Sequence, residues 1–372
     1  RVGILYVNVG GGHSSAAKAL YKELKEEYSD SVEPILIDVG SYSNFLSRWL
    51  LHRGYLLLIN FFLPLWWFFS WISHFRWVMA VWMIIFRNRK YVDNLLKEGN
   101  FDIIVSFYFF ITPTVIALVK KVSPKTEIWT VVTDPFTVPP IWFFVKVAKY
   151  FVFSERAKKT ALVQGIPEKN IFIVAPVINK KFFQARVWSK EAIRNELGFP
   201  LDKKIILVVA GGDGLYQGGK VVETLTNLPN DFCMVVVCGR EKYFFDQATY
   251  LQKKYPNKIL SVFGFVDNME KLMATTDLII SKAGPATIFE ALAVGRPLIL
   301  THYIWEQEKG NCDFVLQNGY GIYQSNLDLL PQTVLDYFEN EYQKSLERIK
   351  DFSCNTGVIE IAQKILKIKN PE

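Results

Sequence analysis

The first candidate for chemistry is a histidine that directly follows a run of glycines. Gly10, Gly11 and Gly12 come after a predicted buried strand at 2–8, and His13 opens a predicted helix. Glycine lets a backbone approach a ligand closely, and the free N–H groups of a helix start attract anions. An imidazole in that position is suited to accept a proton near neutral pH. We interpret His13 as a general base, and a histidine that merely caps the helix is the alternative.

The second candidate is the run SKAGPATIFEAL at 281–292. A predicted strand leads into a tight turn at Gly284, and Pro285 occupies a position where proline favours the start of a helix. The amides of Ala286 and Thr287 would then be unpaired at the positive end of that helix, which suits a diphosphate. A plain helix start would explain Pro285 but not the whole run.

Polar side chains that suit sugar hydroxyls follow this helix start. Glu290 lies one turn inside the helix, where its carboxylate can accept hydrogen bonds from both hydroxyls of a ribose. Gln307 and Asn311 are four residues apart and share one face of a predicted helix with Glu308 nearby. We expect these three to bind the hydroxyls of a sugar, and a solvated helix surface is the alternative.

Two further motifs follow predicted strands. The run AGGDG at 210–214 offers free amides, including that of Gly212, to a phosphate, although the carboxylate of Asp213 suits that role badly. Asp134 ends a strand of the first half, where it could orient His13 or act as the base itself. A surface aspartate in a turn is the alternative. The sequence has no D-x-D pair, so we expect helix dipoles and N–H groups, and no metal ion, to meet a diphosphate's charge.

Short apolar runs alternate with helical patterns along most of the chain, and a second set begins after a linker near residues 175–179. Such alternation predicts parallel sheets with helices on both faces. We expect an α/β fold of two Rossmann-like, doubly wound domains facing a central cleft. The expected domains are 1–178, 179–355 and a C-terminal helix at 356–372 that packs back on the first. The expected strands are 2–8, 35–38, 102–106, 127–133, 150–153, 172–174, 204–209, 232–237, 260–262, 278–281 and 297–300.

A long aromatic segment interrupts the first domain. Residues 54–75 carry no formal charge and are long enough to span a bilayer on length alone, but they contain Pro64 and are rich in tryptophan. We favour interfacial insertion of a segment at 45–90, because tryptophan prefers the headgroup level and the flanking basic residues suit anionic lipid. A buried helix pair and a spanning helix are the alternatives. The tryptophans expected at the membrane are Trp66, Trp67, Trp71 and Trp77.

A second aromatic run, PPIWFFVKVAK at 139–149, has two interpretations. Trp142, Phe143 and Phe144 stand beside Lys146 and Lys149, so the run could be another patch that faces the same membrane and its acceptor. Alternatively, the run is a helix that packs Trp142 and Phe143 inside the domain. The residues alone favour neither interpretation.

Composition narrows the possible functions. The 372 residues include 43 Lys and Arg against 36 Asp and Glu, and 50% are hydrophobic, which excludes a disordered chain. The four cysteines form no C-x-x-C pair, so we expect no structural zinc and a reducing compartment. The net charge of +7 favours an anionic partner. Nucleic acid is not expected, because the basic residues do not form one aromatic-interleaved stripe.

These motifs together resemble a known family. The run SKAGPATIFEALAVGRPLIL with YIWEQEKGN after it resembles the donor site of the monogalactosyldiacylglycerol synthases, and GGGHSSAAKAL and TVVTDP match that family's first-domain motifs. The resemblance implies a GT-B fold, a UDP-sugar in the second domain, a diacylglycerol acceptor in the first, and inverting transfer without metal. The positions it implies for the nucleotide are Gly12, Gly212, Ser281, Gly284, Pro285, Ala286, Thr287 and Glu290.

The resemblance also implies a reaction. We expect a glycosyltransferase on the cytoplasmic face of a membrane, peripheral or monotopic, that moves galactose from UDP-galactose to diacylglycerol. His13, helped by Asp134, would deprotonate the acceptor hydroxyl. The alternatives are glucosyl transfer to diacylglycerol, N-acetylglucosaminyl transfer to a polyprenyl-diphosphate lipid, and a non-catalytic adaptor that binds nucleotide or anionic lipid.

Overall fold

The chain divides into two compact units. A computed structural model describes residues 1–7, 11–39, 99–109, 112, 115, 119, 121, 123–211, 214–215, 217–304, 307–352 and 355–369. Unit 1 comprises Arg1–Asn179 and Thr356–Glu372, and unit 2 comprises Lys180–Asn355. The boundaries expected at 178/179 and 355/356 lie within one residue of this division.

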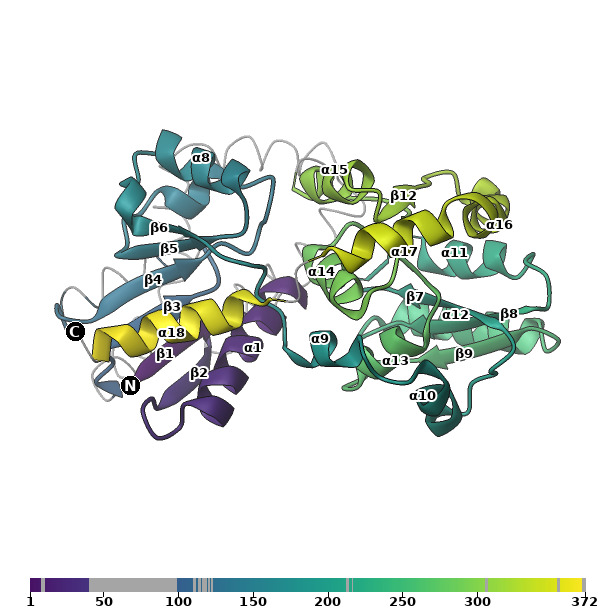
Figure 1. Ribbon diagram of the computed structural model, residues 1–372, viewed down its shortest axis with the longest axis horizontal. Coiled ribbons are helices and arrows are strands. Elements are labelled where there is room, and N and C mark those ends of the chain that lie inside the picture. Colours follow the sequence, from purple (N-terminus) through teal and green to yellow (C-terminus); the bar gives the residue numbers. More distant parts are fainter. Residues whose placement is uncertain are drawn as a thin grey trace. The chain divides into compact units, whose positions relative to one another are not determined.

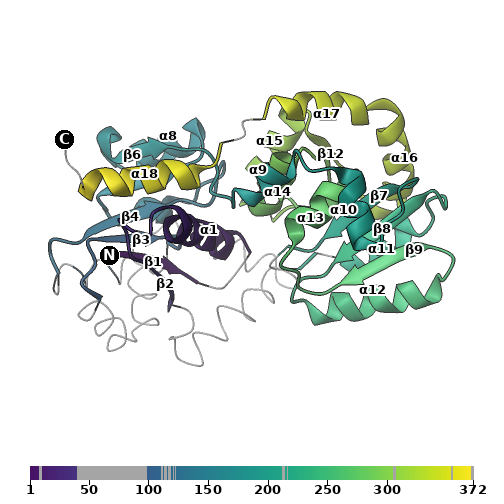
Figure 2. The ribbon, with the colours of Figure 1, turned by 60° about the horizontal axis from the view of Figure 1, so that its bottom comes forward.

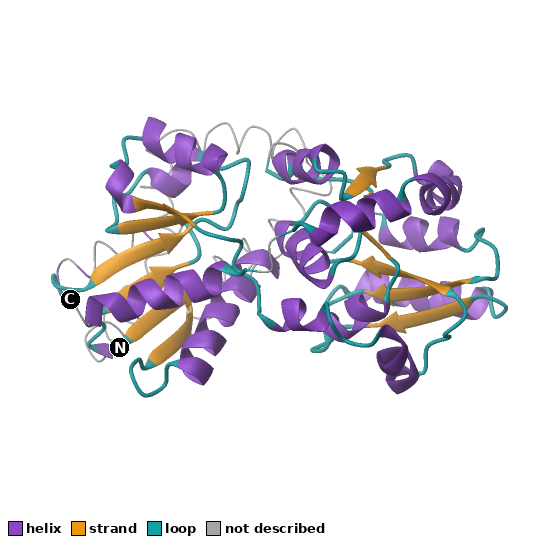
Figure 3. Ribbon diagram, in the orientation of Figure 1, coloured by secondary structure: helices purple, strands orange, loops and turns teal. Residues whose placement is uncertain are grey.

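Unit 1 contains a parallel sheet in the order β2-β1-β3-β4-β5-β6. The order reverses between β1 and β3, which marks the place where ligands bind in such sheets. Figure 3 shows the strands as arrows that point the same way. The elements are β1 (Val2–Tyr6), α1 (Gly11–Glu27), β2 (Pro34–Asp38), β3 (Ile103–Ser106), β4 (Glu127–Val131), η3 (Pro140–Phe143), β5 (Lys149–Val152), α8 (Glu155–Val163), η4 (Glu168–Asn170), β6 (Ile171–Ile173) and α18 (Gly357–Lys369).

Alternate residues of the strands supply the two cores of unit 1. Val2 and Ile4 of β1 pack on one face of the sheet with α1 and α18, whereas Leu5 packs on the other. Figure 1 shows α18 and α1 lying over the same strands. The Glu360 carboxylate accepts a hydrogen bond from the N–H of Ala175 at 2.9 Å. This bond connects α18 to the segment that follows β6.

Unit 2 contains a second parallel sheet, in the order β12-β11-β10-β7-β8-β9. The order reverses between β7 and β10. Helices α11 and α12 cover one face, and α13 and α14 lie on the other (Figure 2). The elements are α9 (Lys181–Ala185), α10 (Lys190–Leu197), β7 (Lys204–Val209), α11 (Gly218–Leu225), β8 (Phe232–Val237), α12 (Lys242–Lys254), β9 (Ile259–Phe263), α13 (Met269–Thr275), β10 (Leu278–Ser281), α14 (Pro285–Val294), β11 (Leu298–Leu300), α15 (Lys309–Gln317), β12 (Gly321–Tyr323), η5 (Leu327–Leu329), α16 (Leu330–Asn340) and α17 (Tyr342–Lys350).

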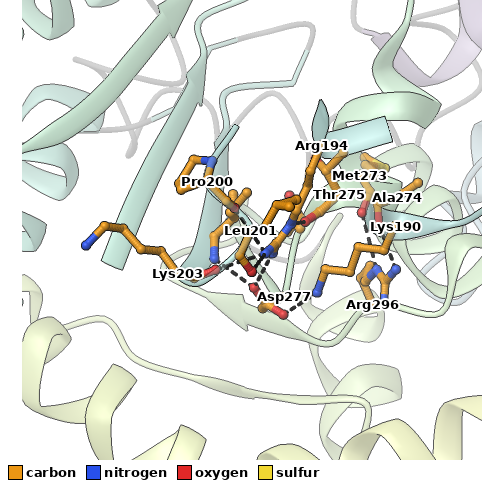
Figure 4. Close-up of polar contacts among 12 residues, drawn as sticks. Lys190, Arg194, Pro200, Leu201, Lys203, Met273, Ala274, Thr275, Asp277 and Arg296 are labelled. Carbon is orange, nitrogen blue, oxygen red and sulfur yellow. Dashed lines mark hydrogen bonds and ion pairs between the residues drawn. The ribbon is translucent and has the colours of Figure 1, made fainter. Parts of the chain in front are cut away.

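An ion cluster around the buried Asp277 and Arg194 fixes the amino ends of β7 and β10 (Figure 4). The Asp277 carboxylate pairs with Lys190 and accepts a hydrogen bond from Arg194 at 2.8 Å and from the N–H of Ile205 at 2.7 Å. Arg296 donates to two carbonyls at the end of α13. Although burial raises the pKa of Asp277, the charges of Lys190 and Arg194 and the Ile205 amide outweigh it and leave that pKa below its usual value. These contacts hold the two central strands in register.

The structure differs from the expected elements at a few places. Strands expected at 2–8 and 127–133 end earlier, at Tyr6 and Val131, and β12 was not expected. The expected membrane segment at 45–90, with Trp66, Trp67, Trp71 and Trp77, lies outside the described residues. Within the part of the chain that is described, no helix has both the length and the apolarity needed to cross a bilayer.

Candidate functional site

The candidate base of unit 1 stands where the strand order reverses. His13 is in the first turn of α1, after β1, and its Nδ1 lies 2.5 Å from the hydroxyl oxygen of Thr133, which follows β4. The ring of Tyr108, from the loop after β3, packs edge-on at 5.1 Å between centroids. The loops after β3 and β4 therefore both approach His13 at the carboxyl ends of the strands.

Asp134 follows Thr133 in the same loop and binds a neighbouring aromatic side chain. Its Oδ2 accepts the indole N–H of Trp142 at 2.7 Å, and the Trp142 ring lies 6.0 Å from the His13 ring. The Thr133 hydroxyl contacts His13 Nδ1, and a role of Asp134 in orienting His13 stays a prediction. The geometry thus links Asp134 to His13 through an aromatic ring.

The interpretation of 139–149 as a surface patch is wrong for its aromatic residues. Trp142 is 3% exposed, and Phe143 and Phe144 are also buried. Trp142 and Phe143 belong to a hydrophobic core of unit 1, because η3 turns their rings inward. The structure therefore shows the alternative interpretation, packing inside the domain. A contact of Trp142 with the acceptor stays a prediction.

The two glycine motifs follow the central strands β1 and β7 of the two sheets. A Cβ added at Gly12 would meet no atom of the described residues within 4 Å, so they leave open space beside this position at the start of α1. Gly212 lies outside the described residues. Its neighbour Gly211 has φ +69°, a conformation that favours glycine, and it follows β7 at the point where the order of the second sheet reverses.

The start of α14 has the geometry expected of an anion site. Gly284 is the N-cap in an extended conformation, Pro285 takes the first helical position, and no side chain caps the helix. Ala286 and Thr287 follow in the first turn, where N–H groups have no partner within the helix. Ser281 is fully buried, and its hydroxyl donates to the Val209 carbonyl at 3.0 Å. Ser281, the last residue of β10, therefore connects β10 to β7 just before the start of α14.

Glu290 is half-buried on α14. Burial raises the pKa of its carboxyl to about 8; nearby Glu270 adds to the rise, and the charge of Lys181 opposes it. Lys181 itself pairs with Glu270 at 2.6 Å. A ligand that donates hydrogen bonds to the ionised form of this carboxyl group would lower its pKa.

The expected hexose residues lie at the start of α15. Gln307 is half-buried, whereas Glu308 and Asn311 are buried and have protein partners. Glu308 pairs with Lys282 at 2.5 Å, and the Asn311 amide donates to the Ala283 carbonyl at 2.9 Å. Asn311 Oδ1 is buried and accepts no hydrogen bond within the described part of the chain. Contact of these three residues with a sugar stays a prediction.

Sequence reasoning missed Thr133 and Lys282. Thr133 precedes the conspicuous Asp134, and Lys282 precedes the turn at Gly284, so each stood inside a motif that was recognised for its neighbours. Their partners, His13 and Glu308, are 120 and 26 residues away along the chain. Only the fold brings these pairs together.

Two family models match the chain in succession. Residues 13–178 match monogalactosyldiacylglycerol (MGDG) synthase, and residues 206–365 match the glycosyltransferase family 28 C-terminal domain. The chain is 30% identical to a probable monogalactosyldiacylglycerol synthase 2, chloroplastic, of Oryza sativa subsp. indica, over 98% of this chain and 80% of the relative.

Solved structures share the fold at low sequence identity. A complex of MnaA with UDP from S. aureus has a TM-score of 0.64 at 11% identity, covering 99% of this chain and 96% of that one. WaaG, a glycosyltransferase involved in lipopolysaccharide biosynthesis, has a TM-score of 0.57 at 13% identity and full coverage of both chains. With its two parallel sheets, the chain has the expected α/β GT-B fold. It belongs to the monogalactosyldiacylglycerol synthase family and is a hexosyltransferase.

Proposed function

We propose that this glycosyltransferase of galactolipid synthesis transfers galactose from UDP-galactose to the free hydroxyl of 1,2-diacylglycerol. The observation that carries the proposal is the placement of His13, held by Thr133 at the carboxyl edge of the unit 1 sheet, in a chain of this family. The hydroxyl oxygen attacks the anomeric carbon, its proton passes to His13, and the bond to UDP breaks. A single displacement of this kind inverts the anomeric centre.

The departing UDP carries negative charge that must be stabilised. We place its diphosphate at the start of α14, where the amides of Ala286 and Thr287 and the helix dipole meet it without a metal ion. We expect the backbone N–H groups at Gly12 and Gly212 to bind the diphosphate as well, because glycine lets a ligand approach the backbone closely. Support comes from the uncapped helix end, because an N-terminus without a side-chain cap leaves its N–H groups for a ligand.

The ribose and the hexose would bind on either side of this diphosphate. Glu290 is one turn along α14, where its ionised carboxylate would accept hydrogen bonds from the two ribose hydroxyls. Gln307 and Asn311 would contact the hexose. The buried Asn311 Oδ1, which has no hydrogen bond within the described residues, supports a role for that amide.

We propose that the acceptor is taken from a membrane surface. Residues 45–90, with Trp66, Trp67, Trp71 and Trp77, would insert at the headgroup level of the cytoplasmic face. The net charge of +7 would favour anionic lipids there. Liposome flotation of the chain with neutral and anionic vesicles tests this part separately from the chemistry.

One assay tests the reaction. The chain is incubated with diacylglycerol and radiolabelled UDP-galactose or UDP-glucose, with and without EDTA, and the lipids are separated by thin-layer chromatography. We expect a β-galactosyl product from UDP-galactose that EDTA does not diminish. A product from UDP-glucose alone would replace galactose by glucose in the proposal. Membrane binding with no transfer from either donor would favour the adaptor alternative.

A further inference from the structure

A buried ion pair lies beside the start of α14. Lys282 and Glu308 are 7% and 4% exposed, and Nζ of Lys282 lies 2.5 Å from Oε1 of Glu308. The second carboxylate oxygen of Glu308 accepts the N–H of Ile304 at 3.0 Å. The pair therefore connects the loop after β10 to the loop after β11 and to the start of α15.

The ammonium of Lys282 stands next to two glycine positions. A Cβ added at Gly284 would lie 3.7 Å from Nζ of Lys282, and one added at Gly211 would lie 3.8 Å from Cε. Gly284 is the N-cap of α14, and Gly211 follows β7. Because β7 and β10 are the strands between which the sheet order reverses, the charge lies where this type of fold binds its ligand.

Stability alone does not favour such an arrangement. Removing two charges from water is costly, and replacing a buried ion pair by apolar groups of similar volume is often neutral or stabilising. A cation near the start of a helix also opposes the positive end of the helix dipole. An arriving diphosphate would change this balance, because its negative charge would meet both the ammonium and the helix end.

We propose that Lys282 binds the diphosphate of the nucleotide sugar, and that Glu308 is a positioning residue that holds the ammonium in place and is not a ligand of the hexose. The inference rests on the proposed function, since it needs a UDP-sugar at α14. As the bond from the anomeric carbon to UDP breaks, the fixed ammonium stabilises the charge that develops on the leaving oxygen.

Calorimetry of the full chain with UDP and with uridine tests the role of Lys282. Lys282→Met should weaken UDP binding by about 10- to 100-fold, as expected for a hydrogen bond to a charged group. Uridine lacks the phosphates, so its affinity should change by less than about twofold. Lys190→Met is the control, because it breaks a partly buried lysine–carboxylate pair at the opposite end of β10 and should leave UDP affinity unchanged.

Two Glu308 variants separate a positioning role from direct contact with the sugar. In Glu308→Gln, the affinities for UDP and UDP-galactose should change by the same factor; weaker UDP-galactose binding with unchanged UDP binding would overturn the role of Glu308. The exchanged pair, Lys282→Glu with Glu308→Lys, should recover the thermal stability lost in Lys282→Glu but not UDP affinity. Normal UDP binding by the exchanged pair or by Lys282→Met would overturn the role of Lys282. If the wild-type chain binds no UDP, the proposed function itself fails.

Discussion

The imidazole Nδ1 of His13 lies 2.5 Å from the hydroxyl oxygen of Thr133, a residue of another loop at the same edge of the unit 1 sheet. With Nδ1 engaged in this way, Nε2 is the nitrogen that we expect to take the acceptor proton. A protonated Nδ1 would donate to the Thr133 oxygen and keep Nε2 in its basic form. The contact therefore orients the ring of the proposed base, and the proposed reaction uses the tautomer in which Nδ1 carries the hydrogen.

Removing the Thr133 hydroxyl tests that contact. Thr133→Val should lower kcat by about 10-fold, the effect of one hydrogen bond to a group that becomes charged, and leave the Kd of UDP unchanged. Thr133→Ser keeps the hydroxyl and should retain most of the turnover. Steady-state kinetics with both variants would contradict the account if Val and Ser gave equal rates.

The open space beside Gly12 gives a substitution that separates folding from ligand approach. The added methyl of Gly12→Ala meets no atom of the described residues within 4 Å. The free energy of unfolding should therefore stay the same or rise by up to about 1 kcal/mol. If a substrate must approach this backbone, kcat/KM should nevertheless fall. An alanine variant with wild-type kcat/KM would remove Gly12 from the binding site.

Glu290 predicts that UDP binding releases protons. Burial, with help from Glu270 and against the charge of Lys181, raises the pKa of Glu290 to about 8, so the free protein holds this proton at pH 7. A carboxylate that accepts two ribose hydroxyls must be ionised, so UDP affinity should rise with pH up to about 8. Calorimetry at pH 7 in buffers of different ionisation enthalpy should show close to one proton released. Glu290→Gln should release none, and equal proton release by both proteins would contradict the ribose assignment.

The ion cluster at Asp277 predicts an acid-sensitive part of the stability. Because the folded pKa of Asp277 is lowered, its contribution is present above the unfolded pKa of about 4 and is lost as the pH falls through the folded value. Asp277→Asn should cost about 3 kcal/mol at pH 7 in urea unfolding, with a smaller difference at pH 3. Asp246→Asn, which breaks an exposed pair with Lys242, should cost less than about 0.5 kcal/mol. Equal costs for the two variants would contradict the assignment.

Local signals made part of this structure predictable. Pro285 after a glycine turn marked the start of α14, and continuous apolar runs marked the central strands β7, β8 and β10 at their observed bounds. Strand β12, Gly321–Tyr323, was not predicted, because its sequence GIY contains a glycine and forms no continuous apolar run. Position 321 has no room for a side chain, since a Cβ added at Gly321 would lie 1.9 Å from the Leu298 carbonyl oxygen.

The contacts of the candidate site depend on the fold and could not be predicted. In the sequence, Trp142 stands near two lysines, as a surface aromatic residue would. Only the structure shows that its ring lies in the core. His13–Thr133 joins loops at the carboxyl edge of the unit 1 sheet, and Lys282–Glu308 does the same at the unit 2 sheet. Sequence spacing gives no signal for a pair that forms only when parallel strands align.

The most direct measurement compares turnover and donor binding in one variant, His13→Ala, using UDP-galactose and diacylglycerol. Without the base, we predict that kcat falls by about 10²–10⁴-fold while the Kd of UDP, bound in unit 2, stays within about twofold of wild type. A His13→Ala protein that turns over at the wild-type rate would contradict the central claim.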